Sequence, residues 1–185
     1  MEHPKRRREW LAGRIAAKTA IRLLLAPNAP ELNNIVIETG EEGSPRVVLQ
    51  AGAAAPPSIT ITHSHDLAAA LATVRSGFGI DVEAIGPSVS EIESSFTAPE
   101  EAERVQKLVP GREAALTCLW VAKEACRKAL GVNRVAIRDL TLDDIYSSDE
   151  YLVSVFLDPG ARAVRCVMFA GERYAYAVAG PAQTP

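Results

Sequence analysis

Eight residues near the middle of the chain, FGIDVEAI at positions 78–85, decide how the rest of the sequence is interpreted. Because side chains alternate across a β-strand, Asp81 and Glu83 would project from one face and their apolar neighbours from the other. Two carboxylates on one face repel each other unless a positive charge lies between them. A hard divalent cation such as Mg²⁺, which takes oxygen ligands, would satisfy that need. A solvent-facing strand edge is the alternative for such a pair.

Upstream of this run, the sequence predicts one helix followed by short strands. Residues 4–25 have the spacing of an amphipathic helix, with Trp10, Ala17 and Ile21 on a shared apolar face. The segment that follows is rich in Gly, Pro and Asn, which is typical of loops joined by small strands. The predicted strands, which we expect to include antiparallel pairs, are 35–37, 47–49, 58–62, 68–74 and 78–85.

Downstream of the run, helices come first and strands follow. The predicted helices cover 90–96, 99–108 and 112–130. Thr97 and Glu100 have the spacing of a capping box before the second of them, and Gly131 would end the third. The tail from 135 to 178 alternates as strands, with residues 171–172 as a hairpin tip.

The order of helix, strands, helices and strands predicts an α+β protein built from two similar halves. We expect each half to be a small antiparallel sheet packed with helices. The N-terminal half would cover residues 1–85, and the C-terminal half, with the long helix and the last strands, residues 86–185.

Composition limits the class of protein. A chain of 185 residues with 48% hydrophobic residues can bury a core as one domain or two small ones. No stretch approaches the ~18 to 20 apolar residues of a membrane helix, and the basic N-terminal sequence is not followed by the apolar core of a signal peptide. Cys118, Cys126 and Cys166 are an odd count without CxxC spacing, which argues against a disulfide framework or a zinc knuckle. We therefore expect a soluble cytoplasmic protein without membrane attachment.

Charge is unevenly distributed along the chain. The net charge of −3 argues against a dedicated nucleic-acid binder, which normally carries a basic excess. Positive residues concentrate in 5–22, whereas 91–103 is acidic. A basic segment in an acidic protein indicates a local anionic ligand, with a solvated basic helix face as the alternative.

The long predicted helix contains LWVAKEACRKALG at 119–131. Glu124 and Lys128 are four residues apart and therefore adjacent on one face, with Trp120 one turn earlier. Such a pair is ordinarily a surface salt bridge that contributes roughly 0.3 to 0.5 kcal/mol. The functional alternative makes Glu124 a third oxygen ligand or a general base, and Lys128 a phosphate partner.

Two histidines, His63 and His65, occur in ITITHSHD at the end of an apolar alternation. An HxH pair suits zinc, but the pattern HxHxDH of metallo-β-lactamases is incomplete here, because Asp66 comes one position too early. A zinc hydrolase is therefore disfavoured, and a structural role is preferred for His65.

Together, THS before GIDVE and the later LWVAKEACRKALG resemble the Sfp-type 4′-phosphopantetheinyl transferases. The signature of that family is an SHS-like triplet, a GIDIE-like strand and WxxKEAxxK. The resemblance extends to the KRRREWLAGRIAAK helix, to Phe96 with Glu100, and to the closing YAYAVA strand. The G-K-P loop of the family corresponds to Gly43-Ser44-Pro45, where the lysine is absent and Arg46 is a possible substitute.

The resemblance implies a fold and an activity. The fold would be a monomeric pseudo-dimer of two α+β halves, with coenzyme A and Mg²⁺ between them and the N-terminal half binding coenzyme A. The activity would transfer 4′-phosphopantetheine from coenzyme A to a serine of an acyl or peptidyl carrier protein and release adenosine 3′,5′-bisphosphate. Such a holo-[acyl-carrier-protein] synthase would serve fatty-acid, polyketide or peptide synthesis.

The resemblance also implies roles for single residues. Asp81, Glu83 and Glu124 would hold Mg²⁺, and Glu124 would also be the base for the carrier serine. Lys128 would pair with the α-phosphate or protonate the leaving group, and His63 would bind the 3′-phosphate. The residues expected to contact coenzyme A are His63, Lys123, Lys128, Lys5, Arg8, Arg14 and Pro45. An acidic carrier protein would dock beside 96–108.

Three alternatives stay open from the sequence. The chain could be a catalytically silent relative that binds only coenzyme A or a carrier protein, although the intact acidic and basic positions count against this. A zinc hydrolase built on HSHD is the second alternative. A plain interaction domain is the third, and it leaves the joint spacing of four polar motifs to chance.

Overall fold

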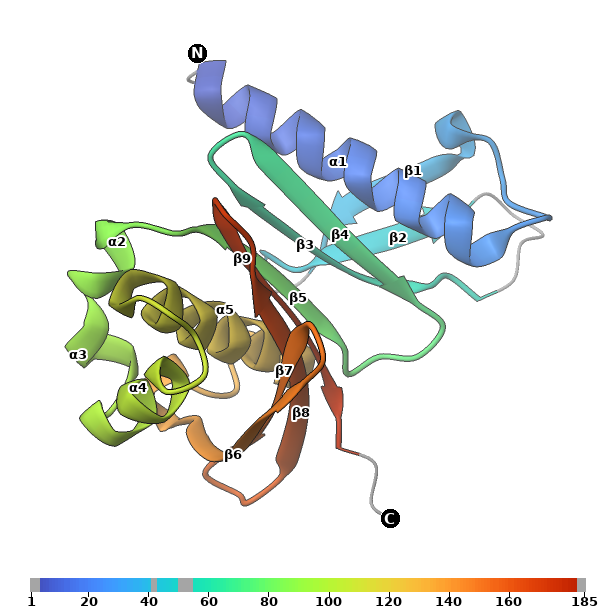
Figure 1. Ribbon diagram of the computed structural model, residues 1–185. Helices are drawn as coiled ribbons and strands as arrows, with labels where there is room; N and C mark the ends of the chain where they lie inside the picture. The colour runs from blue at the N-terminus through green and yellow to red at the C-terminus, as the bar shows by residue number, and fades with distance from the viewer. Residues whose placement is uncertain (1–3, 41–42, 50–54, 183–185) are drawn as a thin grey trace. The chain divides into compact units, whose positions relative to one another are not determined.

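The computed structural model describes residues 4–40, 43–49 and 55–182. The chain forms two compact units, residues 1–76 and 77–185, each of which mixes helices with antiparallel strands (Figure 1). The α+β class is thus confirmed. The boundary differs from the expected 85/86, because the strand with FGIDVEAI pairs with a strand near residue 177 and so belongs to the second unit.

The first unit contains one long helix and two β-hairpins, and the predicted helix at 4–25 is confirmed. Antiparallel pairs join the first strand to the second and the third to the fourth. Its elements are α1 (Pro4–Leu25), η1 (Leu32–Asn34), β1 (Ile35–Thr39), β2 (Pro45–Leu49), β3 (Ser58–Ser64) and β4 (Leu67–Thr73).

Helix α1 packs on the β3–β4 hairpin through small and branched residues. Ala17 and Ile21 are fully buried in a core that also holds Ile59 of β3. Gly13 permits the close approach, because a Cβ there would lie 3.0 Å from the Cγ2 of Ile61. Trp10, expected on the same apolar face, is instead 57% exposed, because only Gly13, Ala17 and Ile21 of α1 are buried.

The second unit is a five-stranded antiparallel sheet with helices on one face. The strand order is β5-β9-β8-β7-β6, so β5 is an edge strand that pairs with β9. The elements are β5 (Gly79–Ala84), α2 (Pro87–Ser90), α3 (Glu93–Phe96), α4 (Pro99–Gln106), α5 (Arg112–Leu130), η3 (Ile137–Asp139), β6 (Thr141–Ser148), β7 (Tyr151–Leu157), β8 (Ala163–Ala170) and β9 (Tyr174–Pro181).

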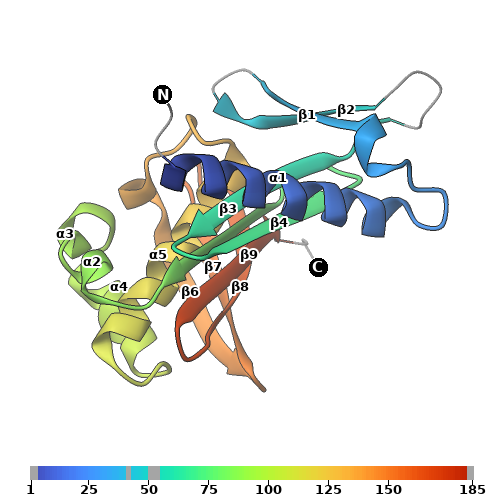
Figure 2. The ribbon, with the colours of Figure 1, turned by 90° about the horizontal axis from the view of Figure 1, so that it is seen from above.

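Helix α5 lies against one face of this sheet and forms the main core of the unit (Figure 2). Ala175, Ala177 and Ala179 of β9 are small enough for the helix to approach closely, and all three are buried with it. The helix ends where the sequence predicted, because Gly131 takes a φ of 102° that glycine tolerates best.

The capping box expected before α4 is shifted by one residue. The helix has Ala98 at its N-cap, and the carboxylate of Glu101, rather than that of Glu100, accepts the Ala98 N–H at 3.1 Å. Pro99 occupies the first turn, so the reaching carboxylate falls at 101. In the described part of the chain, no helix is both long and apolar enough to cross a membrane.

Candidate active site

The backbones of α5 and β5 approach each other closely at Gly79. A Cβ on this residue would overlap the carbonyl oxygen of Ala125 and lie 3.0 Å from the Cβ of Lys128. The missing side chain therefore lets the helix backbone rest on the strand. As a result the ammonium of Lys128 donates to the Oδ1 of Asp81 at 2.7 Å and to the carbonyl of Ile80 at 3.1 Å.

Asp81 and Glu83 project toward α5, as the strand alternation predicted. In the register with β9, Asp81 pairs with Ala177 and Glu83 with Ala175, and both alanines belong to the core under α5. The side chain of Asp81 is only 6% exposed. A carboxylate buried this far is stabilised as an anion by the adjacent ammonium of Lys128, whereas an isolated one would be costly.

Glu124 is held by a neighbour on its own helix. Arg127 donates from Nη2 to the Oε2 of Glu124 at 2.8 Å and from Nε to both carboxylate oxygens at 3.2 and 3.3 Å. The remaining nitrogen, Nη1, donates to the carbonyl of Val132 at 3.0 Å. Glu124 and Lys128 therefore do not form the surface salt bridge that was considered from the sequence. Glu124 pairs with Arg127, and Lys128 pairs with Asp81.

The donor set at β5 and α5 suits a hard cation in part. Asp81, Glu83 and Glu124 offer carboxylate oxygens, and Mg²⁺ is commonly held by one or two carboxylates together with substrate phosphates. Within the described ranges, no three Asp, Glu, His or Cys side chains already surround one point. The chemistry of the donors fits, while Arg127 and Lys128 occupy two of the three carboxylates.

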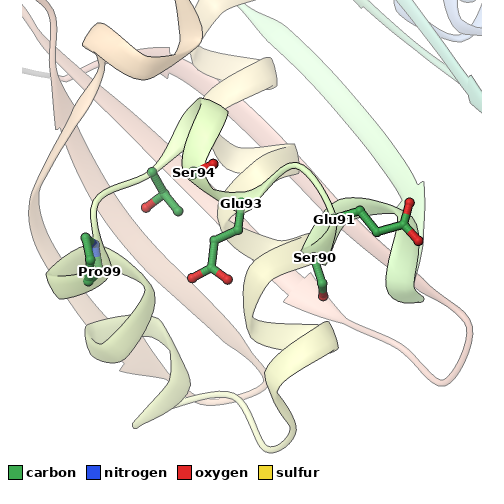
Figure 3. Close-up of a pocket in the computed structure, with 6 residues that line it drawn as sticks. Ser90, Glu91, Glu93, Ser94 and Pro99 are labelled. Atoms are coloured by element: carbon green, nitrogen blue, oxygen red, sulfur yellow. The ribbon is translucent and has the colours of Figure 1, made fainter.

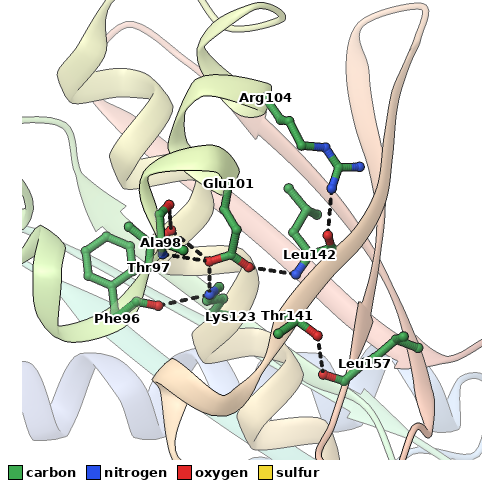
Figure 4. Close-up of polar contacts among 9 residues, drawn as sticks. All are labelled: Phe96, Thr97, Ala98, Glu101, Arg104, Lys123, Thr141, Leu142 and Leu157. Atoms are coloured by element: carbon green, nitrogen blue, oxygen red, sulfur yellow. Dashed lines mark hydrogen bonds and ion pairs between the residues drawn. The ribbon is translucent and has the colours of Figure 1, made fainter.

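Lys123 does not lie where a ligand could contact it, which corrects the expectation that it binds coenzyme A. Its side chain is fully buried, and its ammonium donates to the carbonyl of Phe96 at 2.9 Å and to the Oε2 of Glu101 at 2.6 Å (Figure 4). It points into the protein between α5 and α4. Glu124, its neighbour in the sequence, instead forms an ion pair with Arg127.

Glu101 completes this buried network. Its Oε1 accepts the Leu142 N–H at 2.7 Å, and its Oε2 also accepts the hydroxyl of Thr97 at 2.9 Å (Figure 4). Burial alone would raise the pKa of Glu101, but the hydrogen bonds from Lys123 and Leu142 outweigh it, so the pKa lies below its ordinary value. The network joins α4, α5 and β6 into one rigid support.

In the first unit, His63 is exposed near the end of β3, between the buried residues Thr62 and Ser64. Because Gly13 of α1 faces Ile61, the next side chain on that strand face, His63, lies alongside the turns of α1 before Gly13. Figures 1 and 2 both show the β3–β4 turn beside the N-terminal half of α1. His65 is in that turn, with a φ of 54° and its Nδ1 3.2 Å from the Ser64 hydroxyl.

The basic residues of α1 do not all face His63. Arg14 lies beside the sheet-facing Gly13, and its guanidinium is over the Trp10 ring at 5.0 Å. Arg8, by contrast, precedes Ala17 by nine residues, or about two and a half turns, and therefore points away from the sheet. On this geometry Arg8 and His63 lie on different sides of α1, and no contact in the structure tests the expected binding of Arg8 to coenzyme A.

Two further residues complete the comparison with the expected coenzyme A contacts. Lys5 forms an ion pair with Glu9 at 3.8 Å and remains largely exposed. Pro45 begins β2 opposite Thr39, on a different hairpin from His63. Arg6 was not among the expected contacts. It precedes Ala17 by eleven residues, or about three full turns, and therefore lies on the same side of α1. This spacing could have identified it from the sequence.

Two family models match the chain. Residues 77–179 match the model of the 4′-phosphopantetheinyl transferase superfamily, and residues 2–73 match the 4′-phosphopantetheinyl transferase N-terminal domain. This chain belongs to the 4′-phosphopantetheinyl transferase superfamily. The resemblance seen in the sequence is thereby confirmed, and the two matches fall on the two compact units. No curated protein matches the chain significantly.

Membership gives the general activity of the chain. Enzymes of this superfamily transfer 4′-phosphopantetheine, use coenzyme A as its source and act on carrier proteins. A phosphopantetheinyl transferase needs groups that can hold a pyrophosphate and accept a proton. At the β5–α5 contact, the ammonium of Lys128 meets the carboxylate of Asp81, and Glu124 lies one turn earlier on the same helix.

A depression lies in the same unit along the segment that contains α2, α3 and the start of α4 (Figure 3). It encloses about 500 Å³ and is lined by Ser90, Glu91, Glu93, Ser94, Thr97 and Pro99. Phe96, next to it, is fully buried with its ring 5.0 Å from that of Trp120. The lining is acidic, which does not suit the acidic carrier surface expected to dock beside this segment.

Proposed function

We propose that this phosphopantetheinyl transferase moves the 4′-phosphopantetheine of coenzyme A to a serine of an acyl or peptidyl carrier protein, as a holo-[acyl-carrier-protein] synthase. The reaction would depend on Mg²⁺ and release adenosine 3′,5′-bisphosphate. The observation that carries the proposal is the Lys128–Asp81 contact at Gly79, because it brings a cation and the acidic strand together in a buried position. We further propose that the enzyme acts as a cytoplasmic monomer.

The proposed metal ligands are Asp81, Glu83 and Glu124. When bound there, Mg²⁺ would neutralise the pyrophosphate of coenzyme A and stabilise the charge that develops during phosphoryl transfer. Support comes from the common face of Asp81 and Glu83 and from the position of Glu124 on the helix that covers this face.

The proposed reaction needs one proton acceptor and one phosphate partner. The serine oxygen would attack the phosphorus on the pantetheine side of the pyrophosphate, and the bond from that phosphorus to the leaving bisphosphate would break. Glu124 would accept the serine proton, because a carboxylate beside the bound cation would reach both the serine and the pyrophosphate. Lys128 would exchange its contact with Asp81 for a phosphate oxygen and so stabilise the leaving group.

The nucleotide end of coenzyme A would bind residues of the first unit. His63 and Arg14 lie on the side of α1 that meets the β3–β4 hairpin, and we propose that they hold the 3′-phosphate together with Lys5. Arg6 joins this set on the same geometric ground. Pro45 stays a proposed contact of the nucleotide through its place at the start of β2.

A direct experiment tests the function. The chain would be incubated with coenzyme A, Mg²⁺ and a panel of apo-carrier proteins, and the carriers would then be weighed by mass spectrometry. We expect one carrier class to gain the mass of phosphopantetheine, and EDTA or Asp81→Asn to prevent the gain. Binding of coenzyme A without turnover of any carrier would instead favour a silent relative, and zinc in the purified protein would revive the hydrolase alternative.

A further inference from the structure

Arg127 contacts the proposed site through three of its side-chain nitrogens. It stands at a position that the WxxKEAxxK signature leaves open. Three of its nitrogens are engaged, with Nε and Nη2 on Glu124 and Nη1 on the carbonyl of Val132, just beyond the end of α5. Its side chain is 25% exposed and that of Glu124 is 14% exposed. Water therefore screens this pair less than it screens an ordinary surface pair.

This arrangement has a consequence for the proposed cation site. The oxygens of Glu124 that would bind a divalent cation already accept hydrogen bonds from a guanidinium, and among the residues described here the acidic groups do not surround a common point. A cation that binds Glu124 would compete with this fork for the lone pairs of the carboxylate oxygens. The guanidinium also adds a positive charge near the site, which repels any second cation.

We propose that Arg127 is a positioning residue that holds Glu124 along α5 until a divalent cation binds, and that it thereby weakens the affinity of the site for that cation. The inference rests on the proposed metal site. The contact with Val132 gives Arg127 one partner that it keeps when Glu124 turns away, so release does not leave the guanidinium without a hydrogen bond. Such a site fills readily only when the phosphates of coenzyme A add their own negative charge.

Binding of Mn²⁺ tests this inference without any need for turnover. The free Mn²⁺ signal in electron paramagnetic resonance would be titrated with protein and saturating coenzyme A, in the absence of a carrier. We expect Arg127→Gln to bind Mn²⁺ about 5-fold more tightly than the wild type, the size expected for one partly exposed charged pair. Arg127→Lys, which keeps the charge but loses the fork, should show a smaller gain.

Arg112 provides the matched control. It lies on the same helix, forms an ion pair with Glu93 at 2.6 Å and is 57% exposed, so Arg112→Gln removes the same charge far along α5. This variant should leave Mn²⁺ affinity within about 2-fold, because an exposed charge at that distance is screened. If Arg127→Gln and Arg112→Gln increase the affinity for Mn²⁺ equally, the effect is due to net charge and the inference is overturned.

The remaining outcomes are separable. An Arg127→Gln protein that binds Mn²⁺ no better than the wild type overturns the inference, provided that its thermal unfolding shows a folded protein; if it is unfolded, Arg127→Lys decides in its place. Asp81→Asn, measured in the same way, tests the metal site itself. If Asp81→Asn binds Mn²⁺ as the wild type does, the proposed metal site fails, whatever Arg127 does.

Discussion

The ammonium of Lys128 on α5 lies 2.7 Å from the Oδ1 of Asp81 on β5, on the strand face that the helix covers. This pair explains how a buried carboxylate is tolerated without a metal, because a neighbouring ammonium supplies the positive charge that the anion needs. It also ties the reactive end of the long helix to the acidic strand. Substitutions that change how closely α5 approaches β5 should therefore lower the reaction rate more strongly than they lower the stability of the fold.

Gly79→Ala tests that approach directly. A Cβ would overlap the Ala125 carbonyl and lie 2.8 Å from the Ala129 nitrogen, and backbone atoms cannot turn aside as side chains do. We expect a loss of about 1 to 3 kcal/mol in the free energy of unfolding and a fall of about 100-fold in the transfer rate from misplaced groups. Gly86→Ala is the control, because its Cβ would meet nothing within 4 Å. Urea unfolding and single-turnover rates would decide, and a fully active Gly79→Ala enzyme would contradict the assignment.

Glu124→Gln and Lys128→Ala should separate stability from catalysis. Glu124→Gln loses the basic oxygen, so the rate should fall by about 10²-fold or more, and added Mg²⁺ should not restore it. Lys128→Ala should lower both the rate and the affinity for coenzyme A.

The two residues contact different partners, so their effects on the free energy of unfolding should add in the double variant. Their effects on the logarithm of the rate should fall well short of additive, because both act on one transition state. Near-wild-type rates in both single variants would show that Glu124 and Lys128 have only a structural role.

The buried pair of Glu101 and Lys123 should make the protein sensitive to acid. The pKa of Glu101 is lower in the folded protein than its ordinary value of 4.5. The stabilisation from this group is therefore fully present above pH 4.5 and is lost as the pH falls through the lower, folded pKa.

Glu101→Gln should flatten the dependence of stability on pH in that acidic range, as measured by urea unfolding between pH 3 and about pH 6. Glu93→Gln, which breaks the more exposed pair with Arg112, is the control and should leave the curve nearly unchanged. Lys123→Met should cost about 3 to 5 kcal/mol, because it leaves the buried carboxylate without its cation. An unchanged acid profile for Glu101→Gln would mean that other carboxylates govern acid unfolding.

The first unit gives a prediction about nucleotide recognition. Coenzyme A should bind more tightly than dephospho-coenzyme A, and the difference should shrink as salt rises, because exposed charges are screened over about 8 to 10 Å. Arg14→Ala and Arg6→Ala should reduce the preference, whereas Arg8→Ala, on the opposite side of α1, should not. Isothermal titration with both nucleotides would measure this. A preference that depends on Arg8 alone would contradict the orientation deduced for the helix.

Local periodicity was enough to predict the two long helices and the common face of Asp81 and Glu83, whereas the helix predicted at 90–96 is split into α2 and α3. The predicted ranges 4–25 and 112–130 coincide with α1 and α5, and Asp81 and Glu83 share a face as the alternation required. These features depend on neighbours within a few residues, which is the range over which helix and strand periods are read.

The features that the sequence did not predict depend on distant contacts. Lys123 stands in a signature of charged residues and yet is buried, because its partner Glu101 comes from another helix. The attachment of β5 to β9 moved the unit boundary, and no local pattern specifies which strand lies beside an edge. The contact between Arg127 and Glu124 depends on the rotamers of both side chains, and the sequence offers two other basic residues, Lys123 and Lys128, within 119–131.

The pairing of β5 with β9 also sets when the site can form during synthesis. Asp81 lies opposite Ala177, so the acidic strand has no sheet to join until a segment roughly 90 residues later has left the ribosome. At 5–20 residues per second this delay is on the order of ten seconds. During it, a strand with apolar residues on one face and acids on the other waits unpaired, and its two carboxylates would oppose pairing with another copy of the same strand. A nascent chain would therefore acquire the ability to use coenzyme A only as a late, long-range folding event, well after α5 has formed.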